Sequence, residues 1–264
     1  MHPVLIPGRL CMMNATFKDH FSGHAGDYRQ FRPDYPQALF SYLAGIAPTR
    51  ERAWDCATGN GQAAVSLASW FGDVIATDAS AEQVASATVV DGVSYRVASA
   101  ENSGISTESI DLVTVAQALH WFDLEGFANE VQRVLKPGGI LACWTYDLLR
   151  ITPELDALTA QLYGPVLKEY WPAERKLIDS GYRTITLPLK ELPAPDFVMT
   201  SRWGLDHLLG YLATWSAVKR CQRATGADAV AQMADQFREA WGDTDKRQVE
   251  WPLSVRIWQK GDQA

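Results

Sequence analysis

The sequence predicts an α/β fold built on one doubly wound, mostly parallel sheet. The main observation is a regular alternation, in which apolar runs of strand length are separated by stretches whose apolar residues recur at helical spacing. Alternation of this kind builds βαβ units with right-handed crossovers, and these units place successive strands parallel in the same sheet. Seven runs of strand character can be counted along the 264 residues, so we expect a seven-stranded sheet.

The first half of the chain supplies five of these strands. A helix is expected first, at residues 34–47, and it ends at Pro48. Thr58 to Gly61 is expected to form a turn, and Lys136-Pro137-Gly138-Gly139 to stop a helix and turn into the next strand. The strand-like runs lie at 52–57, 73–78, 93–98, 110–116 and 139–146, with helical patterns between them at 62–71, 80–89 and 123–135.

After Tyr146 the pattern becomes mostly helical. Residues 152–181 have helical character that is interrupted at Pro165 and Pro172. An irregular connector is expected at 192–195, then a strand at 197–203 and helices at 205–218 and 227–241. The last run, residues 249–258, alternates as an edge strand does, and Pro252 is compatible with such a position.

The composition is that of a globular protein with an acidic balance. Hydrophobic residues make up 47% of the chain and the formal net charge is −7. No block of lysine and arginine is present, which argues against a nucleic-acid partner. No apolar run approaches the length that spans a bilayer, and Met1–Met13 lacks the continuous apolar core of a signal peptide. We therefore expect a cytoplasmic protein without a membrane partner, either a monomer or a homodimer.

The cysteines and histidines do not indicate a metal centre. The four cysteines are far apart and form no Cys-x-x-Cys pair, and the histidines are not clustered. We expect no metal site. Cys56 and Cys143 lie in apolar runs, where cysteine behaves as a small buried residue, and such usage fits a reducing compartment.

The most informative motif is a glycine turn between two acidic residues. Asp55 lies at the end of the first strand, Gly59 and Gly61 follow in the turn, and Asp78 ends the second strand. With Ala64 this spacing also satisfies the dinucleotide fingerprint, so a nicotinamide-dependent oxidoreductase is one interpretation and close helix–strand packing is another. The carboxylate of Asp55 disfavours a pyrophosphate at the helix N-terminus and suits a cationic ammonium group.

Two later segments reach the same edge of the predicted sheet. Ser99-Ala100-Glu101 follow the third strand, where small and polar residues can meet the edge of an adenine. The fourth strand ends in polar and aromatic residues, among them Gln117 and His120. Because the carboxyl ends of parallel strands lie at one edge, these segments and the glycine turn are expected to meet.

Together these motifs resemble those of the class I S-adenosylmethionine-dependent methyltransferases. Asp55-x-x-x-Gly59-x-Gly61 is similar to the first motif of the family, and Asp78 to the acidic residue that closes its second strand. Ser99-Ala100-Glu101 stands at the position of the adenine-proximal loop. The fourth-strand and pre-fifth-strand signatures are matched by Ile110–Val113 and Leu135–Gly139.

Further segments resemble the small-molecule branch of this family, the type 11 methyltransferases that include trans-aconitate methyltransferase-like proteins. They are Phe17–Phe21, Tyr28–Pro36, Ala118–Phe122 and Gly210–Ser216. The resemblance implies a Rossmann-like methyltransferase fold with a helical cap in its C-terminal part. It implies a flexible tail at 1–16, an S-adenosylmethionine-binding core at 17–147 and, at 148–264, the rest of the sheet and a cap over the acceptor site.

The resemblance also implies which residues bind the cofactor. Asp78 would accept the two ribose hydroxyls, although an aspartate there can instead cap the next helix. Gly59 and Gly61 would let the backbone approach the cofactor, and Asp55 would engage the methionine ammonium or brace the turn. The remaining candidates are Ala57, Ala79, Ser99, Ala100, Glu101 and Gln117, with Tyr28 and Arg32 closing over the methionine end.

Ala57 departs from the family pattern, which has a glycine at this position. Alanine adds only a methyl group, so the turn can survive if the φ of Ala57 is negative.

The acceptor side of the site is less defined by the sequence. A sulfonium methyl group is a strong electrophile, so a carboxylate acceptor needs no base, while a hydroxyl or amine would be helped by one. His120 is the candidate base, although a histidine followed by two aromatic residues is also typical of a packed loop. Candidates for the acceptor pocket are Trp144, Tyr146, Trp171, Trp203 and Trp215, with Arg150, Arg202 and Arg220 for an anionic group.

The predicted function is methyl transfer from S-adenosylmethionine to a small molecule, with carboxylic acids among the expected acceptors. Two alternatives stay open: a nicotinamide-dependent oxidoreductase, and a non-catalytic regulatory module that binds the cofactor.

Overall fold

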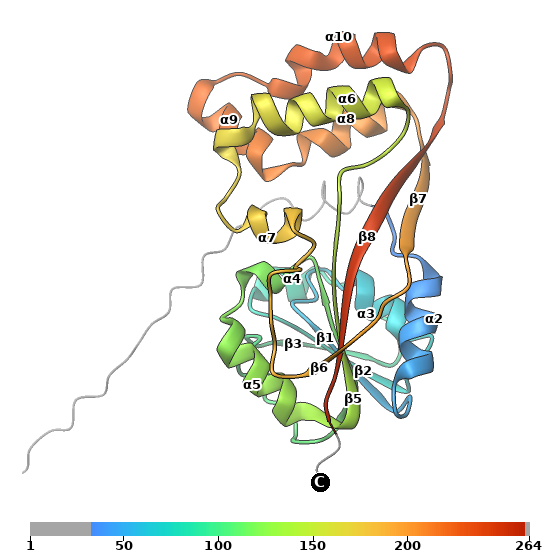
Figure 1. Ribbon diagram of the computed structural model, residues 1–264, viewed down its shortest axis with the longest axis vertical. Coiled ribbons are helices and arrows are strands. Elements are labelled where there is room, and N and C mark those ends of the chain that lie inside the picture. The colour runs from blue at the N-terminus through green and yellow to red at the C-terminus, as the bar shows by residue number, and fades with distance from the viewer. Residues whose placement is uncertain (1–32, 262–264) are drawn as a thin grey trace, which may run out of the picture.

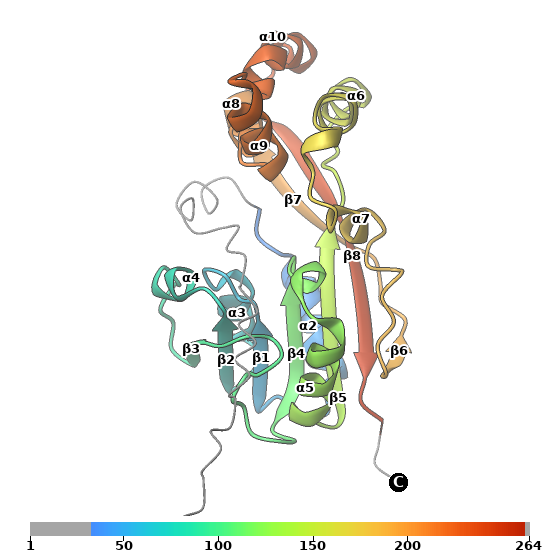
Figure 2. The ribbon, with the colours of Figure 1, turned by 90° about the vertical axis from the view of Figure 1, so that its left-hand side faces the viewer.

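The computed structural model describes residues 33–261, and the predicted tail at 1–16 and the candidates Tyr28 and Arg32 lie outside this range. Figures 1 and 2 show an α/β unit at one end of the long axis and a group of helices at the other. Two long strands, β7 (Phe197–Trp203) and β8 (Arg247–Gln259), connect the two parts.

One mixed sheet organises the α/β unit. Within the described residues its strand order is β3-β2-β1-β4-β5-β8-β6, and β7 pairs with β8 off this path. The strands β1 to β5 are parallel to one another, and β8 runs antiparallel to β5, β6 and β7. The α/β fold is confirmed: seven strands lie along the main path, and β7 makes an eighth. The other bounds are β1 (Arg52–Cys56), β2 (Asp73–Asp78), β3 (Val93–Val97), β4 (Ile110–Ala116), β5 (Leu135–Tyr146) and β6 (Lys190–Leu192).

Helices cover the faces of the parallel strands and form the second part of the molecule. Figure 2 shows α6, α8, α9 and α10 grouped beyond the edge of the sheet toward which β4 and β5 point, and we call these four helices the cap. The helices of the first half are α2 (Gln37–Ile46), α3 (Gln62–Leu67), α4 (Ala81–Ala85), η1 (Leu119–Trp121) and α5 (Leu124–Val134). Those of the second half are α6 (Pro153–Gln161), the π-helix η2 (Leu162–Val166), η3 (Lys168–Tyr170), α7 (Arg175–Asp179), α8 (Leu205–Ala213), α9 (Ser216–Thr225) and α10 (Ala229–Trp241).

The alternation of side chains along the strands divides the core into two layers. On β5, Ala142 and Trp144 belong to the layer that contains α2, whereas Leu141 and Cys143 belong to the layer that contains α5. The α2 layer continues into the cap, where Phe237 of α10 is fully buried in the same cluster. The cap therefore packs on the sheet through a continuous apolar core.

Two expectations for the second half of the chain are wrong, and one strand was not expected. The strand that was not expected is β6, which ends at the first residue of the connector expected at 192–195, and the sequence carries no signal for these three residues. The helix expected at 205–218 is two helices, because the Thr214 hydroxyl donates to the Tyr211 carbonyl at 2.6 Å and Trp215 is extended. Finally, β8 is an interior strand rather than an edge strand.

Pro252 is tolerated in the interior strand because of where it stands. The β5 ladder ends at the Tyr146–Leu253 pair, and the Pro252 carbonyl accepts the N–H of Asp147 at 3.1 Å. The carbonyl and nitrogen of one residue point to the same side of an antiparallel strand. The Pro252 nitrogen therefore points to the β5 side of the strand, at a position beyond the last β5–β8 pair. The hydrogen bonds between β8 and β7 are not affected by its missing N–H.

Candidate functional site

The glycine turn between β1 and α3 has the left-handed backbone that favours glycine. The φ angle is +57° at Gly59 and +92° at Gly61, and a Cβ at Gly61 would lie 2.3 Å from the hydroxyl oxygen of Tyr95. Ala57 also has a positive φ, +54°, so the turn forms without the negative φ that would suit an alanine. A left-handed alanine costs about 1–2 kcal/mol, which other contacts of the turn must offset.

Asp78 lies at the end of β2 with its carboxylate against this turn. One oxygen accepts the N–H of Gly59 at 2.9 Å and the other accepts the N–H of Ser80 at 2.8 Å. The N-cap of α4 is Ser80, whose hydroxyl accepts the N–H of Gln83 at 3.3 Å, so Asp78 does not cap the helix. A carboxylate oxygen can accept more than one hydrogen bond, which places Asp78 to receive hydroxyl donors beside the turn.

Asp55 is buried beneath the turn with an exposed fraction of 1%. Its two oxygens accept the hydroxyls of Thr58 at 2.6 Å and of Thr114 at 2.7 Å, which ties β1 to the turn and to β4. Burial raises the pKa of Asp55 to about 6, although the two threonine hydroxyls and the N–H of Ala64 oppose this shift. Bracing of the turn is thus the role that these contacts give to Asp55.

Gln117, directly after β4, combines a strained backbone with a buried donor. Its φ is +59°, and its side-chain oxygen accepts the hydroxyl of Thr145 at 3.1 Å. The amide nitrogen Nε2 is buried and has no partner within residues 33–261. A buried unpaired donor costs about 1–3 kcal/mol, and strained backbone clusters at functional positions. Both features indicate a ligand-binding position.

The loop after β3 lies beside this turn. The N–H of Ala98 donates to the carbonyl of Asp78 at 3.0 Å, which holds the start of the loop against the end of β2. Ser99 is exposed and Ala100 is buried. Glu101 accepts the N–H of Asp123 at 3.3 Å at the start of α5. The Glu101 carboxylate therefore has a contact within the protein.

These residues fit the S-adenosylmethionine expected from the sequence. Asp78 supplies an acceptor for hydroxyl groups, and half-buried Ala79 follows it. Gly61 leaves a space that a Cβ could not occupy, and Gln117 holds a donor in need of an acceptor. The predicted ligands from the ends of β1, β2, β3 and β4 meet at the carboxyl edge, next to the point where the strand order reverses between β1 and β4.

His120 lies on η1 in a buried pair with a tyrosine that the sequence analysis missed. His120 Nδ1 and the hydroxyl oxygen of Tyr182 are 2.9 Å apart. Burial, with a smaller effect of the Arg175 charge, lowers the pKa of His120 to about 4. Tyr182 is fully buried with φ +60°, and burial raises its pKa. No local motif marks Tyr182, which reaches His120 from 62 residues along the chain.

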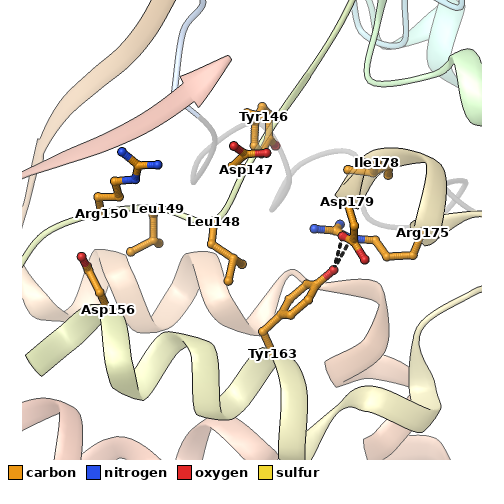
Figure 3. Close-up of a pocket in the computed structure, with 10 residues that line it drawn as sticks. All are labelled: Tyr146, Asp147, Leu148, Leu149, Arg150, Asp156, Tyr163, Arg175, Ile178 and Asp179. Atoms are coloured by element: carbon orange, nitrogen blue, oxygen red, sulfur yellow. Dashed lines mark hydrogen bonds and ion pairs between the residues drawn. The ribbon is translucent and has the colours of Figure 1, made fainter. Parts of the chain in front are cut away.

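A cavity of about 570 Å³ lies between the sheet and the cap (Figure 3). It is lined by residues 146–150 of the β5–α6 connection, Asp156 of α6, Tyr163 of η2, and Arg175, Ile178 and Asp179 of α7. The volume is that of a small-molecule site. Because the segment 146–150 directly continues β5, the cavity begins at the carboxyl edge that carries the cofactor candidates.

Only two of the predicted acceptor residues line this cavity, Tyr146 and Arg150. Trp171 and Trp215 pack around Tyr163, with ring centroids 4.7 and 5.9 Å from it. The others are placed elsewhere: Trp144 is buried in the core, Trp203 of β7 meets Trp251 of β8 edge to face, and Arg202 and Arg220 are not among the lining residues.

Arg175 has its partners inside the protein. Its Nε donates to the Tyr163 hydroxyl at 2.8 Å and to Asp179 at 3.2 Å, and the Tyr163 hydroxyl donates to Asp179. Its guanidinium carbon lies 4.6 Å from the ring centroid of Trp171. No sequence motif marks this cluster, because its members lie on η2, on α7 and at Trp171 after η3.

Within residues 33–261, no helix combines the length and apolar character needed to cross a bilayer. The same residues hold no group of three or more histidine, cysteine, aspartate or glutamate side chains arranged to bind a metal ion.

Comparison with known proteins agrees with this geometry. Residues 54–143 match the family model described as a methyltransferase domain. A candidate methyltransferase of Dictyostelium discoideum is 33% identical over 233 residues, 87% of this chain and 89% of the relative. The Aspergillus terreus methyltransferase gedG is 35% identical over 126 residues, 44% of this chain and 39% of its own. The structure of a candidate type II methyltransferase from Anaeromyxobacter dehalogenans is 44% identical with a TM-score of 0.85, and covers 88% of this chain and 100% of its own.

These similarities support the methyltransferase interpretation of the sequence over the nicotinamide-dependent oxidoreductase. Membership of the trans-aconitate methyltransferase-like branch stays a prediction. The chain belongs to the class I S-adenosylmethionine-dependent methyltransferases, and S-adenosylmethionine is its cofactor.

Proposed function

We propose that this methyltransferase transfers the methyl group to a carboxylate oxygen of a small molecule held in the cavity between sheet and cap. The observation that carries the proposal is Arg150, whose side chain lines the cavity and has no hydrogen bond or ion pair within residues 33–261. Its backbone is held by two hydrogen bonds with Glu250, at 2.8 and 2.9 Å. A guanidinium on a fixed backbone and without an internal partner suits a carboxylate, which it can bind through two parallel hydrogen bonds.

The cofactor side of the proposal uses the turn and the strand ends. S-adenosylmethionine, when bound, supplies an electrophilic methyl group on a sulfonium centre. Asp78 would accept the ribose hydroxyls, Gly59 and Gly61 would leave the backbone open to close approach, and Gln117 Nε2 would donate to a cofactor acceptor. Asp55 would hold the turn in shape from below through Thr58.

The properties of His120 favour a carboxylate over a hydroxyl or an amine. With a pKa of about 4, its imidazole is neutral at pH 7 and too weak a base to remove a proton efficiently from a hydroxyl or an ammonium group. A carboxylate is already the nucleophilic form at this pH. The residues of the chain then have to orient the acceptor, and the charged residues that line the cavity suit this task.

The chemical nature of the product tests this proposal. The protein would be incubated with methyl-labelled S-adenosylmethionine and a metabolite extract, and the products then treated with mild alkali. A methyl ester releases labelled methanol under these conditions, whereas methyl groups on nitrogen or on an ether oxygen stay attached. We expect volatile label with the wild type, and about tenfold less with Arg150→Gln because a charged hydrogen bond is lost.

The matched control is Arg223→Gln, which changes an exposed arginine of α9 outside the cavity and should leave the rate unchanged. Label that is stable to alkali would contradict the proposal. Binding of S-adenosylhomocysteine without any labelled product would favour the remaining alternative, a regulatory module that binds the cofactor without catalysis.

A further inference from the structure

The charged residues that line the cavity fall into two groups. Arg175 and Asp179 form an ion pair at 3.2 Å, so their charges offset each other. The carboxylate of Asp156 accepts the N–H of Ile151 at 2.7 Å but faces no cation within hydrogen-bonding distance. Asp147 and Arg150 have no side-chain partner at all within the described residues.

Asp147 and Arg150 lie three positions apart on the connection from β5 to α6, and this segment is held in place by β8. The N–H of Asp147 donates to the Pro252 carbonyl at 3.1 Å, and the N–H of Arg150 donates to the Glu250 carbonyl at 2.8 Å. Figure 3 shows both charged side chains pointing away from α6, while the two leucines between them point toward it. The fold therefore places one anion and one cation three residues apart on one wall of the cavity.

The balance of these charges argues against an acceptor that carries carboxylates alone. Once the Arg175–Asp179 pair is set aside, one cation (Arg150) and two anions (Asp147 and Asp156) remain, a net charge of −1. A purely anionic molecule would gain one attraction and meet two repulsions. A molecule with one carboxylate and one cationic nitrogen would find a partner for each of its charges.

We propose that the methyl acceptor is an amino carboxylic acid in its zwitterionic form, with the carboxylate at Arg150 and the cationic nitrogen at Asp147. This inference rests on the proposed function and adds the second recognition contact of the same site. The alternation of charge on one short, backbone-fixed segment is the feature that selects this class.

The same arrangement explains why the carboxylate, and not the nitrogen, receives the methyl group. The Asp147 carboxylate stabilises the protonated form of the amine, and a protonated amine has no lone pair with which to attack. The acceptor's carboxylate oxygen forms the new O–C bond as the S–C bond breaks, and the electron pair of that bond stays on sulfur. No proton or oxidant is required. The resulting methyl ester has lost its negative charge, which weakens its attraction to Arg150 and favours release.

The experiment uses ion exchange at pH 7 to divide a bacterial metabolite extract into zwitterionic, anionic and cationic fractions. Each fraction is incubated with the full-length protein and methyl-labelled S-adenosylmethionine, and label that alkali releases is counted. We expect this label in the zwitterionic fraction, with a rate about tenfold lower for Asp147→Asn and restored by Asp147→Glu. Asp235→Asn, the same change at a residue of α10 that is 97% exposed, is the matched control and should behave as the wild type.

Calorimetry with S-adenosylhomocysteine establishes that each variant is folded, because Asp147 is not among the cofactor candidates. Alkali-labile label in the anionic fraction alone would overturn the inference and leave the proposed function intact. Equal rates for Asp147→Asn and Asp235→Asn on the zwitterionic fraction would also overturn it. Absence of alkali-labile label from every fraction, with S-adenosylhomocysteine binding intact, would contradict the proposed function itself and the inference with it.

Discussion

The buried carboxylate of Asp55 should make the stability of this protein depend on pH in a way that Asp55→Asn abolishes. Burial raises the pKa of Asp55 from 3.8 to about 6 in the folded protein. The folded state therefore binds the proton more tightly than the unfolded state does. Asp55 contributes this stability in full below pH 3.8, and the contribution is lost as the pH rises through 6.

The size of the effect follows from the shift. Two pKa units correspond to about 3 kcal/mol between the two extremes. Between pH 7 and pH 5 the linkage relation gives a gain of about 1.4 kcal/mol in the free energy of unfolding. This gain belongs to Asp55 alone, so it should vanish when the group is replaced by asparagine.

Urea unfolding of the wild type and of Asp55→Asn at pH 7 and pH 5 measures this quantity. Other carboxylates also respond to pH: Asp111 and Glu130 have lowered pKa values through their contacts with Lys136 and Arg133. Their contributions are present in both proteins and cancel in the difference. The wild type should gain about 1.4 kcal/mol relative to the variant on going to pH 5. A difference that is the same at both pH values would refute the assignment of a raised pKa to Asp55.

Three further predictions concern the turn and the cofactor. Gly61→Ala should lose about 2 kcal/mol or more in urea unfolding, because its φ of +92° is strained for alanine and its Cβ would meet the Tyr95 hydroxyl. Gly45→Ala is the control, because no atom lies within 4 Å of the added Cβ, and an alanine in this helix should raise the free energy of unfolding by about 0.5–1 kcal/mol. An equal loss of stability in the two variants would contradict the assigned strain at Gly61. Ala57→Gly should change the free energy of unfolding by no more than about +1 kcal/mol, because relief of the left-handed φ is offset by the entropy of glycine, and a clear destabilisation would show that the positive φ is wrong. Calorimetry with S-adenosylhomocysteine should give an affinity about fivefold lower for Gln117→Ala, since one neutral hydrogen bond is lost, and an unchanged affinity would exclude Nε2 as a ligand.

The parts of the fold that depend on local patterns could be predicted from the sequence. The first five strands, the glycine turn and the acidic residues at the ends of β1 and β2 are marked by apolar periodicity and by residue types within short windows. The prediction that β8 is an edge strand was wrong, because β8 pairs with β6, a three-residue strand that has no periodicity of its own.

The parts of the site that depend on long-range packing could not be predicted. His120 was found by its type and place, but its low pKa comes from burial and from the charge of Arg175, which lies 55 residues further along the chain. The positive φ at Ala57 is imposed by the turn against the preference of the residue. Asp147 stands out only when the structure shows it on the wall of a cavity, beside an arginine without a partner.

Proton release during turnover distinguishes methyl transfer to a carboxylate from methyl transfer to a hydroxyl or an amine. In a weakly buffered solution with a pH indicator, the protons released are compared with the S-adenosylhomocysteine formed from an active extract fraction. A carboxylate acceptor gives up no proton when it is methylated, so the account predicts no proton release above the background without enzyme. Release of one proton for each S-adenosylhomocysteine would identify a hydroxyl or an amine as the acceptor and would contradict the account.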